Sequence, residues 1–494
     1  MERRRASEHS PLMRRQAGLL LHPTSLPGQW GNGDLGAEAY NFINFLVAAG
    51  FSTWQLLPLG PTNGGSPYQC FSAHAGNPQL ISVDKLREWG WLECDPQPGA
   101  DARLDLVRRA HALFRKRNDS VEVMEFARFK QSNSAWLDDF ALYSTLKTVF
   151  NQAAWTEWPG PLRDRDADAL AKAHREHGMA VEDVRFEQFV FYRQWHTLKA
   201  YAHQHGITLF GDLPIFVAHD SADVWAQREY FRLDVQGHPT VVAGVPPDYF
   251  SVTGQRWGNP HYDWEAMEAD GFGWWLHRME SQIELFDLVR VDHFRGFESY
   301  WEVPASEQTA IKGRWVKVPG DALFDALHRR FDPLPVVAED LGIITEEVDA
   351  LRRKWALPGM KVLQFAFDGG PGNPYLPHHH ESNCVVYTGT HDNNTTLGWY
   401  EELNQEQREY LLEYLGYPDQ PMPWPLIRAA YQSVACLVVV PMQDILALGA
   451  EHRMNTPGTE TGNWQWRFTW DQVPPDLASR LHRMAEIYGR LDQR

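Results

Sequence analysis

Acidic side chains directly follow several short apolar runs of the chain. The acids are Asp212 after residues 208–210, Asp292 after 288–291, Glu339 after 336–338, Asp392 after 385–388 and Asp444 after 437–440. If these runs are parallel strands of one barrel, their carboxyl ends meet at one mouth and the acids lie together there. Crowded carboxylates raise the pKa of at least one member, and an acid that keeps its proton can serve as a general acid.

Two of these acids differ in the charge that the sequence places beside them. Arg290 lies two residues before Asp292, so in a strand both side chains point to the same face. A guanidinium there favours the ionised form of Asp292. Glu339 has no equally obvious cation nearby in sequence, so it is the better candidate for a protonated acid. A single acid of this kind is more often a structural cap or ion pair, but the repetition on consecutive runs favours catalysis.

Three kinds of chemistry use such a mouth, and two of them fit poorly. A metal-dependent hydrolase would place His-x-His on its first strand, whereas this strand ends in His22, Pro23 and Thr24. The consecutive histidines 378–380 lie in a proline-flanked loop, where neighbours rarely converge on one ion. Dinucleotide binding needs a glycine-rich turn directly after a strand, and the glycines within residues 31–36 follow a proline-rich turn instead. We therefore expect neither a metal nor a cofactor.

The third chemistry is retaining glycosyl transfer. One carboxylate attacks the anomeric carbon, and a second acid, ~5–5.5 Å away, protonates the leaving oxygen. The side chains that we expect to bind the sugar are Arg290, His293, His391, Asn393, Asp212, Tyr249, Phe250 and Trp257. Aromatic residues make up 13% of the chain, and they can stack on sugar rings or simply fill a core.

Eight apolar runs are predicted to be parallel strands, because nearly continuous Val and Leu are typical of strands covered on both faces. They are residues 19–21, 53–57, 208–210, 288–291, 336–338, 362–365, 385–388 and 437–440. Helical periodicity lies between them, for example at 37–49 before Gly50 and at 184–205 before Gly206. The pattern predicts an α/β fold, a (β/α)₈ TIM barrel with large, mostly helical insertions over its C-terminal face.

The spacing of the strands is uneven, which predicts insertions. We expect a flexible N-terminus over residues 1–16 and a catalytic barrel over 17–494, with inserted subdomains at about 60–205 and about 215–285. The first insertion contains amphipathic stretches at 121–130 and 136–149. A terminal helix is predicted within 475–491.

The composition limits which binding partners and which cellular compartment we expect. The formal net charge is −18, so no excess of basic residues is available for nucleic acid or a membrane surface. The apolar run at 436–442 is far below the roughly 20 residues that a bilayer helix needs. Four scattered cysteines do not make a disulfide framework. We expect a cytoplasmic protein that is a monomer or a weak homodimer.

Several blocks of the sequence resemble one known family, the 4-α-glucanotransferases or amylomaltases, which form glycoside hydrolase family 77 of the α-amylase clan. The blocks are residues 66–69, 211–214, 244–251, 288–297, 338–342, 390–396 and 462–467. They extend over nearly the whole chain. The resemblance implies that Asp292 is the nucleophile, Glu339 the acid/base and Asp392 the stabiliser of the transition state.

The resemblance also implies a substrate and roles for aromatic residues. The substrates would be maltooligosaccharides and α-1,4-glucans, with no cofactor. Tyr249 and Phe250 would lie on a mobile loop that arches over the bound glucan, and Tyr68 would stack near the cleaved bond. Two alternatives stay open: an α-amylase-type hydrolase that uses the same acids, and a glucan-binding protein with an inactive site. The products formed from maltotriose distinguish them, because only a transferase makes chains longer than its substrate.

Overall fold

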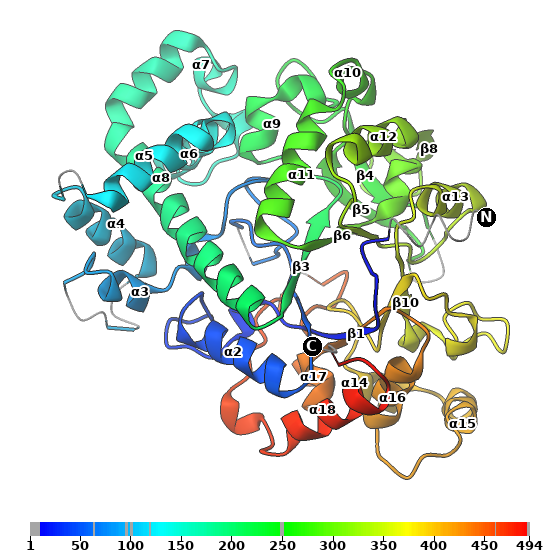
Figure 1. Cartoon of the computed structure of the whole chain (residues 1–494). Coiled ribbons are helices and arrows are strands. Elements are labelled where there is room, and N and C mark those ends of the chain that lie inside the picture. Colours follow the sequence, from blue (N-terminus) through cyan, green and yellow to red (C-terminus); the bar gives the residue numbers. More distant parts are fainter. Residues whose placement is uncertain are drawn as a thin grey trace.

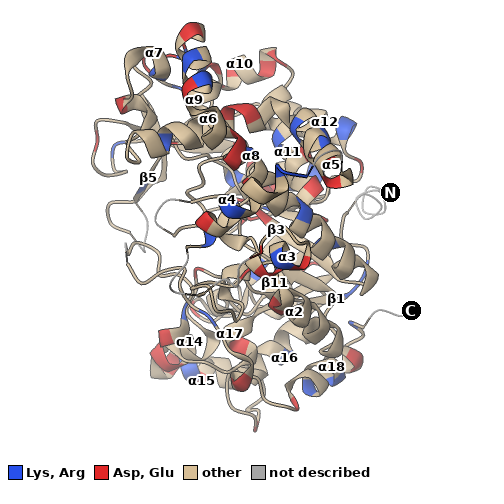
Figure 2. Cartoon of the chain, turned by 90° about the vertical axis from the view of Figure 1, so that its left-hand side faces the viewer, with Lys and Arg blue, Asp and Glu red and all other residues tan. Residues whose placement is uncertain are grey.

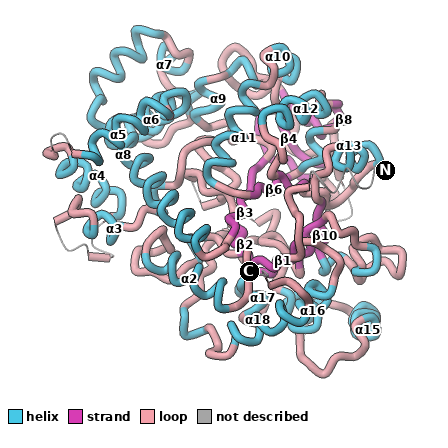
Figure 3. The backbone as a smooth tube through the Cα atoms, in the orientation of Figure 1, coloured by secondary structure: helices cyan, strands magenta, loops and turns pink. Residues whose placement is uncertain are grey.

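The computed structural model describes residues 10–62, 65–93, 97–98, 102–117, 120–247, 251–459 and 461–491. Eight parallel strands lie at its centre: β1 (Gln16–Leu20), β2 (Thr53–Gln55), β3 (Thr208–Pro214), β6 (Leu288–Asp292), β9 (Val336–Ala338), β10 (Gly359–Val362), β11 (Cys384–Tyr387) and β12 (Leu437–Pro441). Their spatial order is β10-β11-β12-β1-β2-β3-β6-β9. Helices surround these strands (Figure 3).

The sheet closes between β9 and β10, the two strands at the ends of this order. The backbone N–H of Ala338 donates to the carbonyl of Pro358 at 2.8 Å, and the N–H of Met360 donates to the Asp340 carboxylate at 2.6 Å. Gly359 makes this approach possible, because a Cβ there would lie 2.4 Å from the Asp340 carboxylate. The predicted (β/α)₈ barrel is therefore present.

The predicted strands are all found, with one displaced. The run at 362–365 was expected to be a strand throughout, but β10 ends at Val362 and Leu363–Phe365 form a short 3₁₀ helix. Leu363 is buried in that turn, so its hydrophobicity reflects burial without strand structure. β1 begins at Gln16, earlier than expected, because Ala17 and Gly18 give little apolar signal.

Long insertions follow two of the strands. The first, between β2 and β3, contains α3 (Val83–Glu88), α4 (Arg103–Phe114), α5 (Val121–Ser132), α6 (Ser134–Val149), α7 (Gly160–Arg163) and α8 (Ala167–Gln204). Figure 1 shows these helices together on one flank of the barrel. The predicted helix at 184–205 is the second half of α8, which departs from helical geometry at His177.

The second insertion contains strands that the sequence analysis did not predict. Between β3 and β6 it contains α9 (Ala222–Ala226), β4 (Val241–Val245), β5 (Gln255–Pro260), α10 (Trp264–Ala269) and α11 (Gly273–Leu285). Beyond this insertion, the connection after β6 contains β7 (Ser299–Pro304) and β8 (Arg314–Lys317), which were also not predicted. The four strands form a separate antiparallel sheet in the order β5-β4-β7-β8. β5 carries a glycine and ends on a proline, so its sequence lacks an ordinary strand pattern.

The remaining helices cover the barrel. They are α2 (Ala37–Ala48), α12 (Gly320–Arg330), α13 (Glu346–Lys354), α14 (Thr396–Glu402), α15 (Gln405–Tyr414), α16 (Trp424–Gln432), α17 (Met442–Ile445) and α18 (Leu477–Ile487). α2 and α18 occupy the predicted ranges. Both signs of charge are interspersed over the outer helices (Figure 2). None of the helices in the described ranges is long and apolar enough to cross a bilayer.

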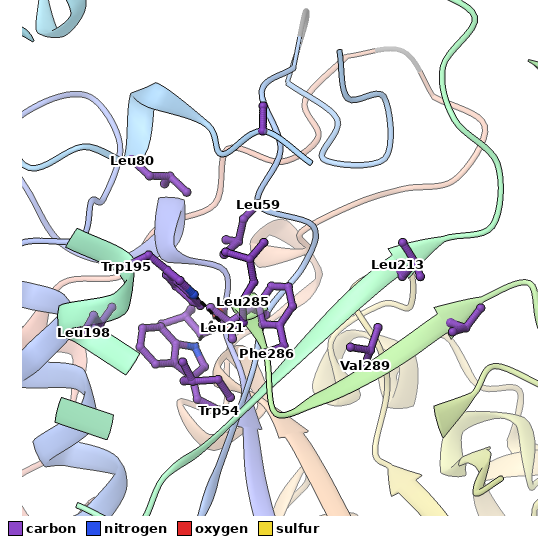
Figure 4. Close-up of a cluster of buried hydrophobic side chains, with 14 of the residues drawn as sticks. Leu21, Trp54, Leu59, Leu80, Trp195, Leu198, Leu213, Leu285, Phe286 and Val289 are labelled. Carbon is purple, nitrogen blue, oxygen red and sulfur yellow. Dashed lines mark hydrogen bonds between the residues drawn. The ribbon is translucent and has the colours of Figure 1, made fainter. Parts of the chain in front are cut away.

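The hydrophobic core between the barrel and α8 explains why the helix docks there. Trp195 of α8 lies beside Phe286, and its indole N–H donates to the Leu285 carbonyl at 2.9 Å (Figure 4). Gly211 of β3 makes room for Phe286, because a Cβ at position 211 would lie 2.2 Å from the ring. Burial of each such aromatic side chain contributes roughly 1.5–3 kcal/mol.

The N-terminal segment was predicted to be flexible over residues 1–16. Residues 1–9 of that segment lie outside the described residues. Within the described part, Ser10 donates to the Asn383 side chain at 2.6 Å, and Arg15 donates to the Ser433 carbonyl at 2.7 Å.

Candidate active site

Adjacent strands bring the predicted nucleophile and acid/base together. β6 pairs with β9 so that Val291 lies opposite Ala338, which places Asp292 and Glu339 at neighbouring strand ends. The Glu339 N–H donates to the Val291 carbonyl at 3.0 Å. On its other side β6 pairs with β3, and Arg290 lies opposite Asp212.

The strand ends open into a cleft of about 970 Å³ that Asp292, Glu339 and Asp392 all border. Among the predicted sugar-binding residues, the cleft is also lined by Tyr68, Trp257, Arg290, His293 and Asn393. Asp212 and His391 do not border it and lie behind Tyr68. Tyr249 and Phe250 lie outside the described residues.

Arg290 connects the nucleophile candidate to a buried acid. Its Nη1 donates to both carboxylate oxygens of Asp212 at 2.8 Å, and its Nη2 lies 2.9 Å from Asp292 Oδ1. Although burial opposes the charge, the two carboxylates hold the pKa of Arg290 well above its ordinary value. Asp212 is only 1% exposed, so it acts on the site through Arg290 and Tyr68.

Glu339 has the environment of a general acid. Burial raises its pKa to about 7, and the charge of Asp292 adds to this while Arg290 opposes it. Its Oε2 accepts the N–H of His293 at 2.7 Å and its Oε1 accepts the N–H of Leu341 at 2.9 Å. His293 adopts a left-handed backbone conformation, with φ of +54°.

Asp392 is held as an anion beside the other two acids. Asn455 Nδ2 donates to its Oδ1 at 2.7 Å, and His391 Nε2 lies 3.3 Å from its Oδ2. Although burial opposes ionisation, His391 and the Asn455 hydrogen bond hold the pKa of Asp392 well below its ordinary value. In turn, Asp392 raises the pKa of His391 against the effect of burial.

Tyr68 connects the two halves of this charge network. Its hydroxyl donates to Asp212 Oδ2 at 2.8 Å and lies 2.8 Å from His391 Nε2. The Tyr68 and His391 rings are stacked with centroids 5.3 Å apart, and the centroid of the Trp464 ring lies 5.8 Å from that of Tyr68. Burial raises the pKa of Tyr68 well above its ordinary value, and Asp212 adds to the effect, so the hydroxyl keeps its proton.

Trp257, His293 and Asn393 are the other predicted sugar-binding residues that line the cleft. The Trp257 ring meets His293 edge to face, with centroids 4.9 Å apart. Asn393 Oδ1 accepts hydrogen bonds from the backbone N–H and the hydroxyl of Thr390, both at 2.8 Å, which fixes the side chain. In the described part of the chain no hydrogen bond engages its amide nitrogen.

Sequence reasoning missed Asn455, which holds Asp392, and gave no role to Trp464, Tyr375 or Asn373, which line the cleft. Asn455 lies beyond the eighth strand next to the turn residues Thr456, Pro457 and Gly458. A polar side chain beside a turn after a barrel strand is the signal that could have indicated it.

The described residues include no group of three or more His, Cys, Asp or Glu side chains placed to hold a metal ion. The histidine tract seen in the sequence includes a short 3₁₀ helix, Pro377–His379, where His379 Nε2 lies 2.8 Å from the Pro371 carbonyl. His380 is buried, with its Nε2 2.8 Å from the Tyr375 carbonyl.

Comparisons with known proteins agree over nearly the full length. The family model for glycoside hydrolase family 77, described as 4-alpha-glucanotransferase, matches residues 21–472. The 4-alpha-glucanotransferase of Thermus thermophilus is 50% identical and that of Synechocystis sp. 49%, each over 97% of this chain and 99% of its own length. A chloroplastic or amyloplastic 4-alpha-glucanotransferase of Arabidopsis thaliana is 44% identical.

A solved structure is similar in the same way. The amylomaltase of Streptococcus agalactiae, solved in complex with acarbose, superposes with a TM-score of 0.93 at 37% identity. The match covers 97% of this chain and 100% of that one.

Proposed function

Because the chain belongs to the 4-alpha-glucanotransferases of glycoside hydrolase family 77, we propose that Asp292, Glu339 and Asp392 carry out its reaction. The enzyme transfers segments of α-glucans. The observation that carries the assignment of residues is the contrast between two acids on adjacent strands. Asp292 is paired with Arg290 at 2.9 Å, whereas burial raises the pKa of Glu339 to about 7.

In the first step, a carboxylate oxygen of Asp292 attacks the anomeric carbon of the donor glucan. The bond from this carbon to the glycosidic oxygen breaks, and Glu339 gives its proton to that oxygen as the leaving glucan departs. The product is a glycosyl ester on Asp292. Arg290 holds Asp292 in place, and the anionic Asp392 stabilises the positive charge that develops on the sugar.

In the second step, Glu339 is a carboxylate and acts as the base. It takes the proton from the 4-hydroxyl of an acceptor glucan, whose oxygen attacks the anomeric carbon. The ester bond breaks, Asp292 is released as a carboxylate, and Glu339 is protonated again. The new bond is α-1,4, because two inversions retain the configuration.

Transfer requires that an acceptor sugar reaches the ester more often than water does. We assign this bias to the insertion that contains Tyr249 and Phe250, which would close over the acceptor. The described neighbour Trp257 lines the cleft and supports a sugar-binding role for this insertion. Replacing both Tyr249 and Phe250 by Ala should raise the ratio of hydrolysis to transfer, and an unchanged ratio would refute the assignment.

The reaction is tested with maltotriose and the residues with two variants. The enzyme should convert maltotriose into glucose and a ladder of longer chains, whereas shorter sugars alone would indicate a hydrolase.

Asp292→Asn should lose at least about a thousandfold in kcat. Glu339→Gln should still react with α-maltosyl fluoride, whose leaving group needs no proton, and the ester should then appear as added mass on the intact protein. No ester on Glu339→Gln, or an ester on Asp292→Asn, would refute the assignment.

We also propose how the chain is organised and in which compartment it acts. Residues 17–494 would form one catalytic unit, with inserted subdomains at about 60–205 and about 215–285. The unit would act in the cytoplasm as a monomer or weak homodimer, without nucleic acid or a membrane as partner. Free thiols at Cys70, Cys384 and Cys436 support a reducing compartment, and the net charge of −18 disfavours polyanionic partners.

A further inference from the structure

An exposed tryptophan lies on β8, the edge strand of the small sheet. Trp315 is 41% exposed. Trp301 of β7 is its partner in register, and the two rings meet edge to face with centroids 5.2 Å apart. The guanidinium of Arg295 lies over the Trp315 ring, with its central carbon 3.9 Å from the ring centroid. The indole is thus fixed by two neighbours while much of it remains accessible.

Arg295 also connects this tryptophan to the cleft. Its Nη1 donates to the carbonyl of Ile343, and Ile343 lines the cleft and is 61% exposed. Arg295 itself is buried between these contacts. Ile343 follows Glu339 by four residues, in the loop after β9. One guanidinium therefore contacts both a residue that lines the cleft and the exposed indole, so Trp315 lies just outside the cleft on the side of Ile343.

We propose that Ile343 and Trp315 form an outer contact for an α-1,4-glucan chain that extends beyond the cleft. The proposal rests on the proposed function, because it assumes that a glucan occupies the cleft. Glucose rings present apolar C–H faces, which pack on an indole held flat by its neighbours. A protein partner would need roughly 800 Å² on this side, far more than two side chains offer, so a narrow polymer fits better.

The test compares a short with a long substrate in Trp315→Ala. The KM for amylose should rise about three- to tenfold, as expected for the loss of one stacking contact. The kinetic constants for maltotriose, a short substrate that we expect to be held within the cleft, should change less than about twofold. Trp315→Phe keeps a ring and should lie between the wild type and Trp315→Ala. Tyr417→Ala, which removes an aromatic side chain that is 57% exposed on the distant α15 side, is the matched control and should affect neither substrate.

A second measurement does not depend on turnover. In the Glu339→Gln background, electrophoretic retardation by amylose in the gel should weaken when Trp315→Ala is added. Equal losses on amylose and maltotriose would show a structural role for Trp315 and overturn the proposal, as would unchanged retardation. Failure of the proposed function is distinct, because the wild-type enzyme would then make no product ladder from maltotriose.

Discussion

At the scale of single residues, the proton on Glu339 determines how activity depends on pH. Burial raises the pKa of Glu339 to about 7, so the carboxyl group carries its proton below that pH and loses it above. The first step needs the protonated form. We therefore expect kcat/KM for maltotriose to fall about tenfold per pH unit above pH 7, because kcat/KM reports groups of the free enzyme.

The control for this pH dependence is a substrate that needs no general acid. The rate of ester formation from α-maltosyl fluoride, measured by rapid mixing and mass spectrometry, should not fall above pH 7. The same alkaline fall with both substrates would assign the ionisation to another group.

The Tyr68 hydroxyl gives a second prediction at this scale. Tyr68→Phe removes the donor to Asp212 and the contact with His391 Nε2, leaving two buried groups each short of a partner. Such groups cost about 1–3 kcal/mol each, and we expect kcat/KM to fall roughly tenfold or more. Tyr431→Phe is the matched control, because the buried Tyr431 hydroxyl has no hydrogen-bond partner in the described part of the chain. Equal effects of both changes would contradict the role given to Tyr68.

Residue-level prediction worked where the relevant spacing was local. The period of two in a strand placed Arg290 beside Asp292, and the ion pair is present at 2.9 Å. Asn455 could not be found in this way, since 63 residues separate it from Asp392 and only the fold brings them together. The sequence also could not indicate that Asp212 lies behind Tyr68 instead of bordering the cleft.

At the scale of elements, Asp444 braces the loop that carries His391 and Asp392. It follows β12, is fully buried, and accepts the hydroxyls of Thr388 and Thr396 at 2.6 Å and the Thr396 N–H at 2.7 Å. These threonines lie on either side of the loop, after β11 and at the start of α14. Asp444→Ala leaves three buried donors without a partner and should destabilise the protein by about 3 kcal/mol or more.

Thermal unfolding measures the loss of stability in Asp444→Ala. The rate of transfer from maltotriose shows whether the loop that carries His391 and Asp392 is affected. Asp444→Asn is the conservative control and should cost much less, because its oxygen can accept the Thr396 N–H and its amide can donate to the hydroxyls. If Asp444→Ala unfolds like the wild type, the loop does not depend on the brace.

Strands and helices were predictable to different degrees. The barrel strands are almost entirely buried, so short apolar runs indicated them in the sequence, although the predicted run at 362–365 overlaps β10 only at Val362. In the small sheet, β5 includes a glycine and β8 is largely exposed, so neither strand shows alternation or a continuous apolar run, and the short apolar run of β4 is interrupted by Gly244. Its strands are held by pairing between distant segments, which a local pattern does not encode.

At the scale of the whole molecule, Arg490 joins the C-terminus to the end of the barrel opposite the cleft. Its guanidinium is buried and donates to the carbonyls of Gln16, Tyr431, Ser433 and Ala435 at 2.9–3.1 Å. Arg490→Met would leave these carbonyls without this donor, and we expect a loss of about 3 kcal/mol or more in unfolding free energy. The kcat of the folded enzyme should be unchanged, since the active site is at the other end.

Arg483→Met is the matched control for this prediction. Arg483 lies on α18, is largely exposed and pairs with Glu486, so its loss should cost less than about 0.5 kcal/mol. Thermal unfolding curves and initial rates of the two variants provide the comparison. A similar shift in both would show that the loss of any arginine near the end of the chain, and not of the buried guanidinium, controls stability.

The chain on either side of the nucleophile strand returns to the same small sheet. β4 precedes β6 and β7 follows it, yet Val242 and Val303 pair across the sheet as neighbours. β6 is thus the middle of a closed loop whose two arms are hydrogen-bonded to each other. A circular permutant with new termini between β5 and β6 would cut one arm of that loop. In such a rearranged chain, the start of the strand that bears Asp292 would lose its covalent connection to the small sheet. Every side chain of the catalytic site would still be present.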